Sequence, residues 1–260
     1  MPWNSALRLC GALLSLFAIS SAAHADVDAF NTYVTAPFVI DDQQGLAPIL
    51  VDRLNAHLPA HFELKLNNVP RKRFTTTVLA EPGRFDGVAL FLAPDFVGDH
   101  DQTHFLWSKP LFMDCNLIVS SMQAPLDYLR PDQFAGLHFG GVPDHHYMQI
   151  DEMAAAGKLT REDAPDEGAN LKKVAARHLD FTVMPFTVYR YTSKALNLGP
   201  HLHVSPKPLD CFARRILIGR RNQPLLKAIN DAIDLLQPDA QWNKAIAHYH
   251  PEPGMLPGGS

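Results

Sequence analysis

Three features are scarce in this chain of 260 residues: cysteine, long apolar runs and an excess of positive charge. The three cysteines and 13 histidines form no cluster with the spacing of a structural zinc site, and we expect neither a metal nor a cofactor. Beyond residue 25, no run is long and apolar enough for a membrane helix. The net charge of −4 argues against nucleic acid as the main partner.

The first 25 residues have the composition of a secretory signal peptide. Arg8 supplies a short positive region, LCGALLSLFAIS an apolar stretch, and Ala23-His24-Ala25 a small-x-small cleavage motif. An N-terminal core helix is the alternative, but nothing caps the segment and Asp26 begins a polar stretch. We predict cleavage after Ala25, which leaves 22 Lys and Arg against 27 Asp and Glu.

Two cysteines, Cys115 and Cys211, remain after this cleavage. In an oxidising compartment, two cysteines predict one disulfide, and two buried free thiols are the alternative.

Short apolar runs alternate with helical patterns along the first half of the mature chain. This βαβαβ order predicts an α/β fold with a parallel sheet covered by helices. The expected elements are a strand and loop over 30–40, a helix over 45–58, a strand over 61–69, a helix over 70–83 and a buried strand over 88–93.

The second half repeats this order, which predicts a second, similar lobe. FDGVALFLAP and LDFTVMPF are the matching features, each an Asp followed by an apolar strand. We expect strands over 137–142 and 179–186, helices over 144–157 and 168–178, and a returning strand over 212–220. An amphipathic helix over 223–236, a short helix over 240–250 and a disordered tail over 251–260 complete the chain.

In the order and spacing of several short segments, the chain resembles the periplasmic solute-binding proteins of the polar amino-acid type. These proteins are the two-lobed receptors of ABC importers, and the resemblance covers nearly all of residues 28–249. The segments are Ala36-Pro37-Phe38, Gly45-Leu46, Phe85-Asp86-Gly87-Val88, Trp107-Ser108-Lys109-Pro110-Leu111, Leu179-Asp180-Phe181-Thr182 and Ile218-Gly219-Arg220-Arg221-Asn222.

The resemblance implies a type II periplasmic-binding fold, with mixed sheets flanked by helices and a two-strand hinge. Lobe 1 would comprise residues 26–112 and 218–250, and lobe 2 residues 113–217. Cys115 and Cys211 would each lie near the hinge, so that a bond between them is geometrically feasible. The protein would be a periplasmic monomer that captures a small molecule between its lobes and presents it to a permease in the inner membrane.

The residues that usually hold an amino acid in this family are missing. Family members carry a Ser or Thr and then an Arg soon after the strand that matches 88–93, but residues 93–99 contain none of these. They carry an acidic residue after the matching strand of lobe 2, where this chain has Pro185 and Phe186. We therefore expect a small organic solute other than a standard α-amino acid held by the usual Arg/Asp pair.

Other residues are candidates for the ligand site. By register, Arg73 falls where relatives place a ligand-stacking aromatic, although it could belong to a solvated charge run. Asp95 follows a buried strand, and capping its own loop is the alternative. Gly141 precedes a predicted helix N-terminus that could bind an anion or be capped by Asp144. The complete set of candidates is Phe38, Arg73, Asp95, Phe96, Gly141, His145, Tyr147, Phe186 and Tyr189.

Two other functions remain as alternatives. Cyclohexadienyl dehydratase-like enzymes share this fold and compartment, and His145, His146 or Asp95 could act as a general acid. The same two-lobed module also serves as a ligand sensor for signalling receptors. Since no pair of residues indicates catalysis, we expect a binding protein rather than an enzyme.

Overall fold

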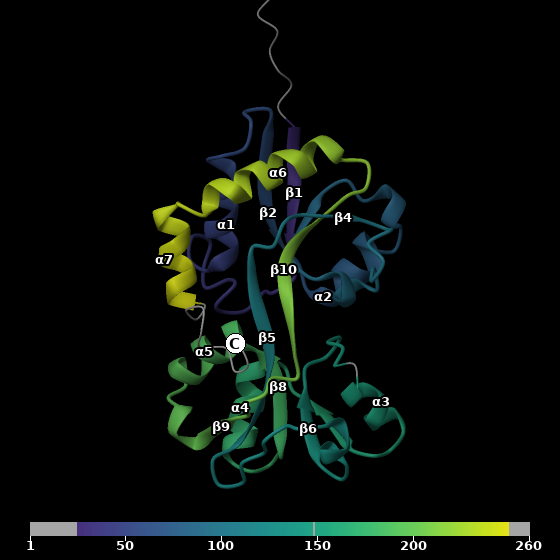
Figure 1. Ribbon diagram of the computed structural model, residues 1–260, viewed down its shortest axis with the longest axis vertical. Coiled ribbons are helices and arrows are strands. Elements are labelled where there is room, and N and C mark those ends of the chain that lie inside the picture. The colour runs from purple at the N-terminus through teal and green to yellow at the C-terminus, as the bar shows by residue number, and fades with distance from the viewer. Residues whose placement is uncertain (1–24, 148, 250–260) are drawn as a thin grey trace, which may run out of the picture.

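A computed structural model describes residues 25–147 and 149–249 (Figure 1). Residues 1–24 of the predicted signal peptide and the predicted tail 251–260 lie outside the described residues. The chain forms two α/β lobes joined by two long strands, as expected. Within the described part, no helix combines the length and the apolar character needed to cross a membrane.

Lobe 1 is built on three parallel strands. The strand β1 (Ala25–Asn31) lies between β2 (Phe62–Asn68) and β3 (Val88–Leu92) and pairs in parallel with both. The helices α1 (Leu46–Asn55), α6 (Gln223–Leu236) and α7 (Ala240–Tyr249) contribute to its largest apolar core. A short helix α2 (Arg71–Arg73), continued by a wider turn over Phe74–Val78, precedes β3.

Lobe 2 repeats this plan. Its strand β6 (His138–Gly141) lies between β8 (Phe181–Pro185) and β7 (Thr160–Asp163), and both pairings are parallel. The helices are α3 (Gln149–Ala155), α4 (Glu167–Ala175) and α5 (Phe186–Ala195), and a short strand β9 (Leu202–Val204) covers one edge. Aromatic side chains, among them Phe134, Phe139 and Phe181, fill one of the two cores of this lobe.

Two antiparallel strands pass between the lobes. They are β5 (Phe112–Ser121) and β10 (Asp210–Ile218), and β10 also pairs with β3 and with β4 (Leu106–Trp107) of lobe 1. The lobe boundaries at 112/113 and 217/218 stay predictions, although they fall at the first residue of β5 and near the end of β10.

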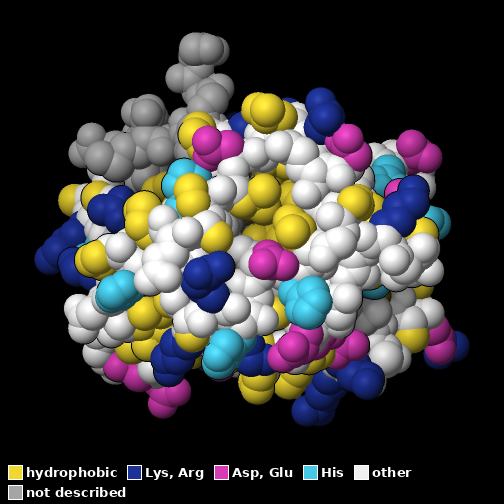
Figure 2. Space-filling view, turned by 90° about the horizontal axis from the view of Figure 1, so that it is seen from below, with side chains coloured by type: hydrophobic (Ala, Val, Ile, Leu, Met, Phe, Trp, Pro, Cys, Tyr) yellow, Lys and Arg dark blue, Asp and Glu magenta, His cyan; other side chains and the backbone are white. Residues whose placement is uncertain are grey.

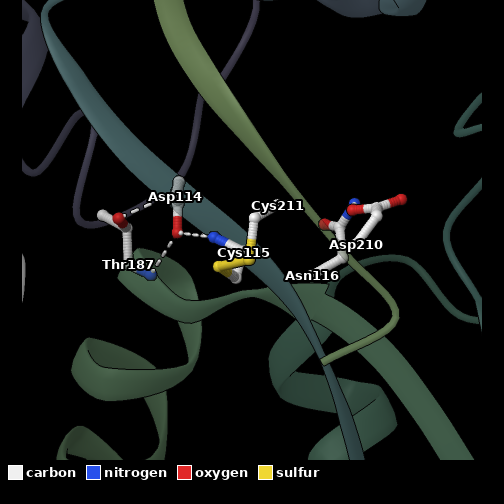
Figure 3. The surroundings of a disulfide bond; sticks show 6 residues. All are labelled: Asp114, Cys115, Asn116, Thr187, Asp210 and Cys211. Atoms are coloured by element: carbon white, nitrogen blue, oxygen red, sulfur yellow. Dashed lines mark hydrogen bonds between the residues drawn. A yellow bond between two sulfur atoms is a disulfide. The ribbon is translucent and has the colours of Figure 1, made fainter. Parts of the chain in front are cut away.

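The predicted disulfide between Cys115 and Cys211 is confirmed (Figure 3). The two cysteines lie directly opposite each other on β5 and β10, with their Cα atoms 4.0 Å apart. Cys115 is fully buried and Cys211 is exposed. The bond therefore joins the two strands that connect the lobes.

The secondary structure differs from the prediction in several places. The first strand occupies 25–31, earlier than the strand and loop expected over 30–40, because its whole length pairs with β2. The short strands β4, β7 and β9 were not predicted, and the helix expected over 70–83 is only the short α2 with its wider turn, which ends at Val78. The helix expected over 144–157 begins only at Gln149, since Asp144 has a positive φ of 62° and residues 142–147 form an irregular loop. The helix N-terminus that we expected to bind an anion beside Gly141 is therefore absent from this loop.

Candidate ligand-binding site

A cavity of about 80 Å³ lies between the lobes. Residues of both lobes form its wall, so that a molecule bound inside would touch both lobes. Lobe 1 and the strand β5 contribute Thr32, Tyr33, Arg71, Phe96 and Asn116, and lobe 2 contributes Asp144, His145, His146, Tyr147, Glu167, Val183 and Pro185.

The wall from lobe 1 is held by contacts among three short segments. The Tyr33 ring follows β1 and stacks on Phe38 with ring centroids 4.5 Å apart. Arg71 donates a hydrogen bond from Nη2 to the carbonyl oxygen of Phe96, and both residues line the cavity. Burial leaves the positive charge of Arg71 poorly solvated, and this lowers its pKa. An anionic partner would offset this cost.

Part of the wall from lobe 2 is the loop 142–147, which is held by hydrogen bonds on the side away from the cavity. The Tyr147 hydroxyl accepts a hydrogen bond from the backbone N–H of Val142 at 3.0 Å. Arg161 donates from Nη2 to the carbonyl oxygens of Val142 and His145, at 3.2 and 3.3 Å. The Asp151 carboxylate accepts from the backbone N–H of Tyr147 at 2.8 Å. These bonds give an irregular loop a defined shape, which holds the rings of His145 and Tyr147 at the cavity.

His145 and Glu167 form a polar pair inside the cavity. The imidazole Nδ1 lies 4.0 Å from Oε1 of Glu167. Burial, together with the charges of Arg71 and Arg161, lowers the pKa of His145 to about 4, so that its ring is neutral at neutral pH. Burial raises the pKa of Glu167. The cavity thus contains a half-buried cation from lobe 1 and a buried carboxyl group from lobe 2, neither paired with a group of opposite fixed charge within the described residues.

Three of the predicted ligand residues line this cavity. They are Phe96, His145 and Tyr147, from segments that lie far apart in the sequence. His146 and Asp144, which the sequence also pointed to, contribute to the same wall.

The other predicted residues lie elsewhere. Arg73 is exposed, and the guanidinium that reaches the cavity belongs to Arg71. Asp95 is exposed and pairs with His100 Nδ1 at 2.7 Å, a contact between two side chains of its own loop. Phe38 is 1% exposed and packs behind Tyr33. Gly141 is buried at the end of β6, where its carbonyl oxygen accepts from Asn170.

Phe186 and Tyr189, on α5, are half-buried and pack against a core of lobe 2 that includes Leu117 and Met184. They are not among the residues that line the cavity.

No sequence pattern pointed clearly to Tyr33, Arg71, Asn116 or Glu167. Tyr33 follows β1 closely, and an aromatic residue at that place could have been considered. Glu167 directly follows Asp166, whose side chain caps α4 by accepting from the N–H of Ala169. Since acidic residues are common in the first turn of a helix, nothing in the sequence separates Glu167 from that ordinary role.

The histidines do not gather into a metal site in the part of the chain that the structure describes. No group of three or more His, Cys, Asp or Glu side chains could hold a metal ion there. Figure 2, which shows the molecule from below, has histidines scattered among acidic and basic side chains around a hollow lined by hydrophobic groups.

No protein-family model and no curated protein matches the chain, but solved structures match its fold. An ancestral arginine-binding protein bound to arginine is 13% identical, with a TM-score of 0.66 over 86% of this chain and 98% of the other. A substrate-binding protein of an ABC uptake transporter from Streptococcus pneumoniae, with bound histidine, is 12% identical, with a TM-score of 0.67 over 87% and 93%.

An ancestral amino-acid-binding protein described as a precursor of cyclohexadienyl dehydratase is 13% identical, with a TM-score of 0.62 over 86% of this chain and 94% of the other. At such low identities these likenesses establish architecture and not activity. The chain therefore has the two-lobed fold of the periplasmic amino-acid-binding proteins.

Proposed function

We propose that this chain is a periplasmic solute-binding protein that captures a small organic molecule between its lobes for an ABC importer. The observation that supports this most directly is the cavity, whose wall comes from both lobes. A ligand that contacts both walls stabilises the closed arrangement over the open one by its differential contacts, and this is how a permease can distinguish a loaded receptor from an empty one.

The side chains of the cavity suggest the chemistry of the ligand. Arg71 can receive an anionic group, since a guanidinium presents a planar fork of donors to a carboxylate or phosphate. Glu167, on the opposite wall, can accept from a hydroxyl, an amide or an ammonium group. Tyr33, Phe96 and Tyr147 offer surfaces for a flat or partly apolar body.

A standard α-amino acid bound by the usual pair of residues is disfavoured. Pro185 lines the cavity where the family's acidic residue is expected, and the segment 93–99 after β3 has no Arg, Ser or Thr. The neighbouring structures with bound arginine or histidine nevertheless make amino acids necessary members of any ligand screen.

The test is a thermal-shift screen of the mature chain against the proteinogenic amino acids, aromatic acids and osmolytes. A tight ligand stabilises the folded state by mass action, by about 2.7 kcal/mol at 100 times its Kd. A compound that raises Tm should also decrease the radius of gyration measured by small-angle X-ray scattering, because the lobes close on it. Stabilisation without any closure would contradict the proposal.

The pair of His145 and Glu167 favours an enzyme as a second candidate. A carboxyl group whose pKa is raised by burial can serve as a general acid, and a neutral imidazole 4.0 Å away can assist it. Turnover of prephenate or arogenate by the purified chain, lost in Glu167→Gln, would replace the binding-protein proposal. Absence of turnover in the wild type would remove this candidate for those substrates.

A further inference from the structure

Arg214, on the strand β10, is a fully buried cation outside the cavity. Its side chain is 0% exposed, and its Nε donates to the Asp114 carboxylate at 2.8 Å. Its Nη1 donates to the carbonyl oxygen of Phe91 at 3.0 Å. Phe91 has a positive φ of 60° in β3, and its carbonyl group is thereby available to β10 at a place where the pairing of these strands is irregular.

Three aromatic rings surround the guanidinium. Its central carbon lies 4.7 Å from the ring centroid of Tyr33, 4.8 Å from that of Phe38 and 5.1 Å from that of Phe212. Aromatic rings around a carboxylate are the arrangement with which proteins bind cationic ligands, because the ring faces are negative. We call Tyr33, Phe38, Phe212, Asp114 and the Phe91 carbonyl the cation cage.

The cage shares walls with the cavity. Tyr33 belongs to both, and Phe212 packs edge-on against Phe96, another cavity residue, with ring centroids 4.7 Å apart. Asp114 reaches lobe 2 as well, since it accepts hydrogen bonds from the hydroxyl and the backbone N–H of Thr187 (Figure 3). The cage therefore lies between the lobes, beside the place where a ligand would bind.

The guanidinium does not use all its donors in this position. Its Nη2 is buried and has no hydrogen-bond partner among the described residues. The cage offers two acceptors, the Asp114 carboxylate and the Phe91 carbonyl, and three rings, and this set would also suit a smaller cation that entered from outside.

We propose that Arg214 is an internal occupant of a cation-binding cage and that it determines specificity by excluding the cationic group of a solute from that position. With arginine in place, the cage is filled and the Asp114 carboxylate is paired with the guanidinium. With a small neutral residue in place, the carboxylate and the three rings would remain, and a soluble cation could take the vacated position.

The experiment uses the full mature chain with Arg214→Ala and methylguanidinium as the probe. Methylguanidinium at millimolar concentration should raise the Tm of Arg214→Ala saturably and leave that of the wild type no higher than equal sodium chloride does. Methylurea, which has a similar shape and no charge, should not stabilise the variant. If methylguanidinium stabilises Arg214→Ala no more than the wild type, or no more than methylurea does, the proposal is wrong.

The matched control is the double variant Asp114→Asn, Arg214→Ala, which has the same space and no carboxylate. Its affinity for methylguanidinium should be at least about tenfold weaker, because a charge-assisted hydrogen bond is lost. Equal affinity in the single and the double variant would contradict a site built on Asp114.

Arg214→Ala leaves a buried carboxylate alone and could fail to fold. In that case it is refolded with methylguanidinium or with sodium chloride. Recovery with methylguanidinium only supports the proposal, and failure with both contradicts it, since a cage that binds cations should accept the soluble substitute.

Discussion

Two arginines on the same short helix have different surroundings. Arg71 lines the cavity and Arg73 is exposed. We expect Arg71→Ala to weaken binding of the compound identified in the ligand screen by about tenfold or more, because a hydrogen bond between charged groups contributes about 1.5–3 kcal/mol. Arg73→Ala is the matched control, and isothermal titration calorimetry measures both. A loss confined to Arg73→Ala would favour the register predicted from the sequence.

His145 should make stability depend on pH. Its pKa is lowered to about 4 in the folded protein, whereas an unfolded chain has a histidine pKa near 6.5. Between these values the unfolded chain binds more protons, so that this contribution to stability is lost as the pH falls from about 6.5 toward 4. The raised pKa of Glu167 acts in the opposite direction. Above a pH of about 4.5 the folded protein holds this proton more strongly than the unfolded chain does, so that the contribution of Glu167 to stability is lost as the pH rises.

The comparison of His145→Gln with the wild type isolates the histidine. Urea unfolding at pH 5 and pH 7 should show a smaller loss of stability at pH 5 for His145→Gln than for the wild type. His146→Gln is the control, because this neighbouring side chain is 87% exposed. Identical pH dependence in the wild type and His145→Gln would show that His145 is not desolvated in solution.

At the scale of single residues, the sequence identified cavity side chains that come soon after a predicted strand. Phe96 follows β3, and His145 and Tyr147 follow β6, although the sequence placed the last two on a helix that begins only at Gln149. Arg71 is the first residue of α2, and Arg73, two residues further on, points to a different face of the helix, so that the first arginine and not the third reaches the cavity. A choice between positions two residues apart needs the angle of the helix, which the sequence does not contain.

At the scale of elements, the disulfide between β5 and β10 should contribute strongly to stability. It closes a sequence separation of 96 residues, for which loop entropy predicts about 4–5 kcal/mol, and the usual measured range is about 2–5 kcal/mol. Cys115→Ala, Cys211→Ala should therefore show a lower free energy of unfolding in urea. A reductant should lower the stability of the wild type and leave the double variant unchanged. If the double variant were as stable as the wild type, the disulfide would have no stabilising role.

The helix α6 gives a second prediction at this scale. Its predicted range, 223–236, is confirmed at both ends, and most of its apolar residues form one buried face, although Leu235 is exposed. Ile229→Ala should destabilise the protein by about 2–5 kcal/mol, because it leaves a cavity under a side chain that is 0% exposed.

Lys227→Ala is the control for this helix, since Lys227 forms an exposed pair with Asp231, and it should change the stability by less than about 0.5 kcal/mol. Denaturant unfolding with unchanged m-values measures both variants. A similar loss in both would contradict the packing of this face.

Elements with strong periodicity were predictable, and elements defined by tertiary contacts were not. The helix α6 has a regular apolar stripe, and β2 and β3 have clear strand patterns. By contrast, β7 is a four-residue strand of mostly exposed polar residues that exists because β6 pairs with it. The late start of α3 depends on the Asp151 side chain and on Arg161, which reaches the loop from another part of the chain.

At the scale of the whole molecule, the order of elements carried most of the information. Two βαβ units joined by two crossing strands can be arranged in few ways, so that the fold could be predicted although its ligand could not. The cavity depends on how the two lobes approach each other, and no local sequence pattern predicts this arrangement. Lobe closure is the corresponding prediction, and inter-lobe distances measured by fluorescence transfer should shorten when a ligand from the screen is added.

The disulfide also makes most of lobe 2 a covalent ring. Residues 115 and 211 close it, and β6, β7, β8 and α3 to α5 all lie between them. A protease that cuts one loop inside this ring would open it without releasing a fragment. The cut protein should run as one species on a non-reducing gel and as two after reduction. The same loops are places where new chain ends could be introduced while the hinge strands stay linked.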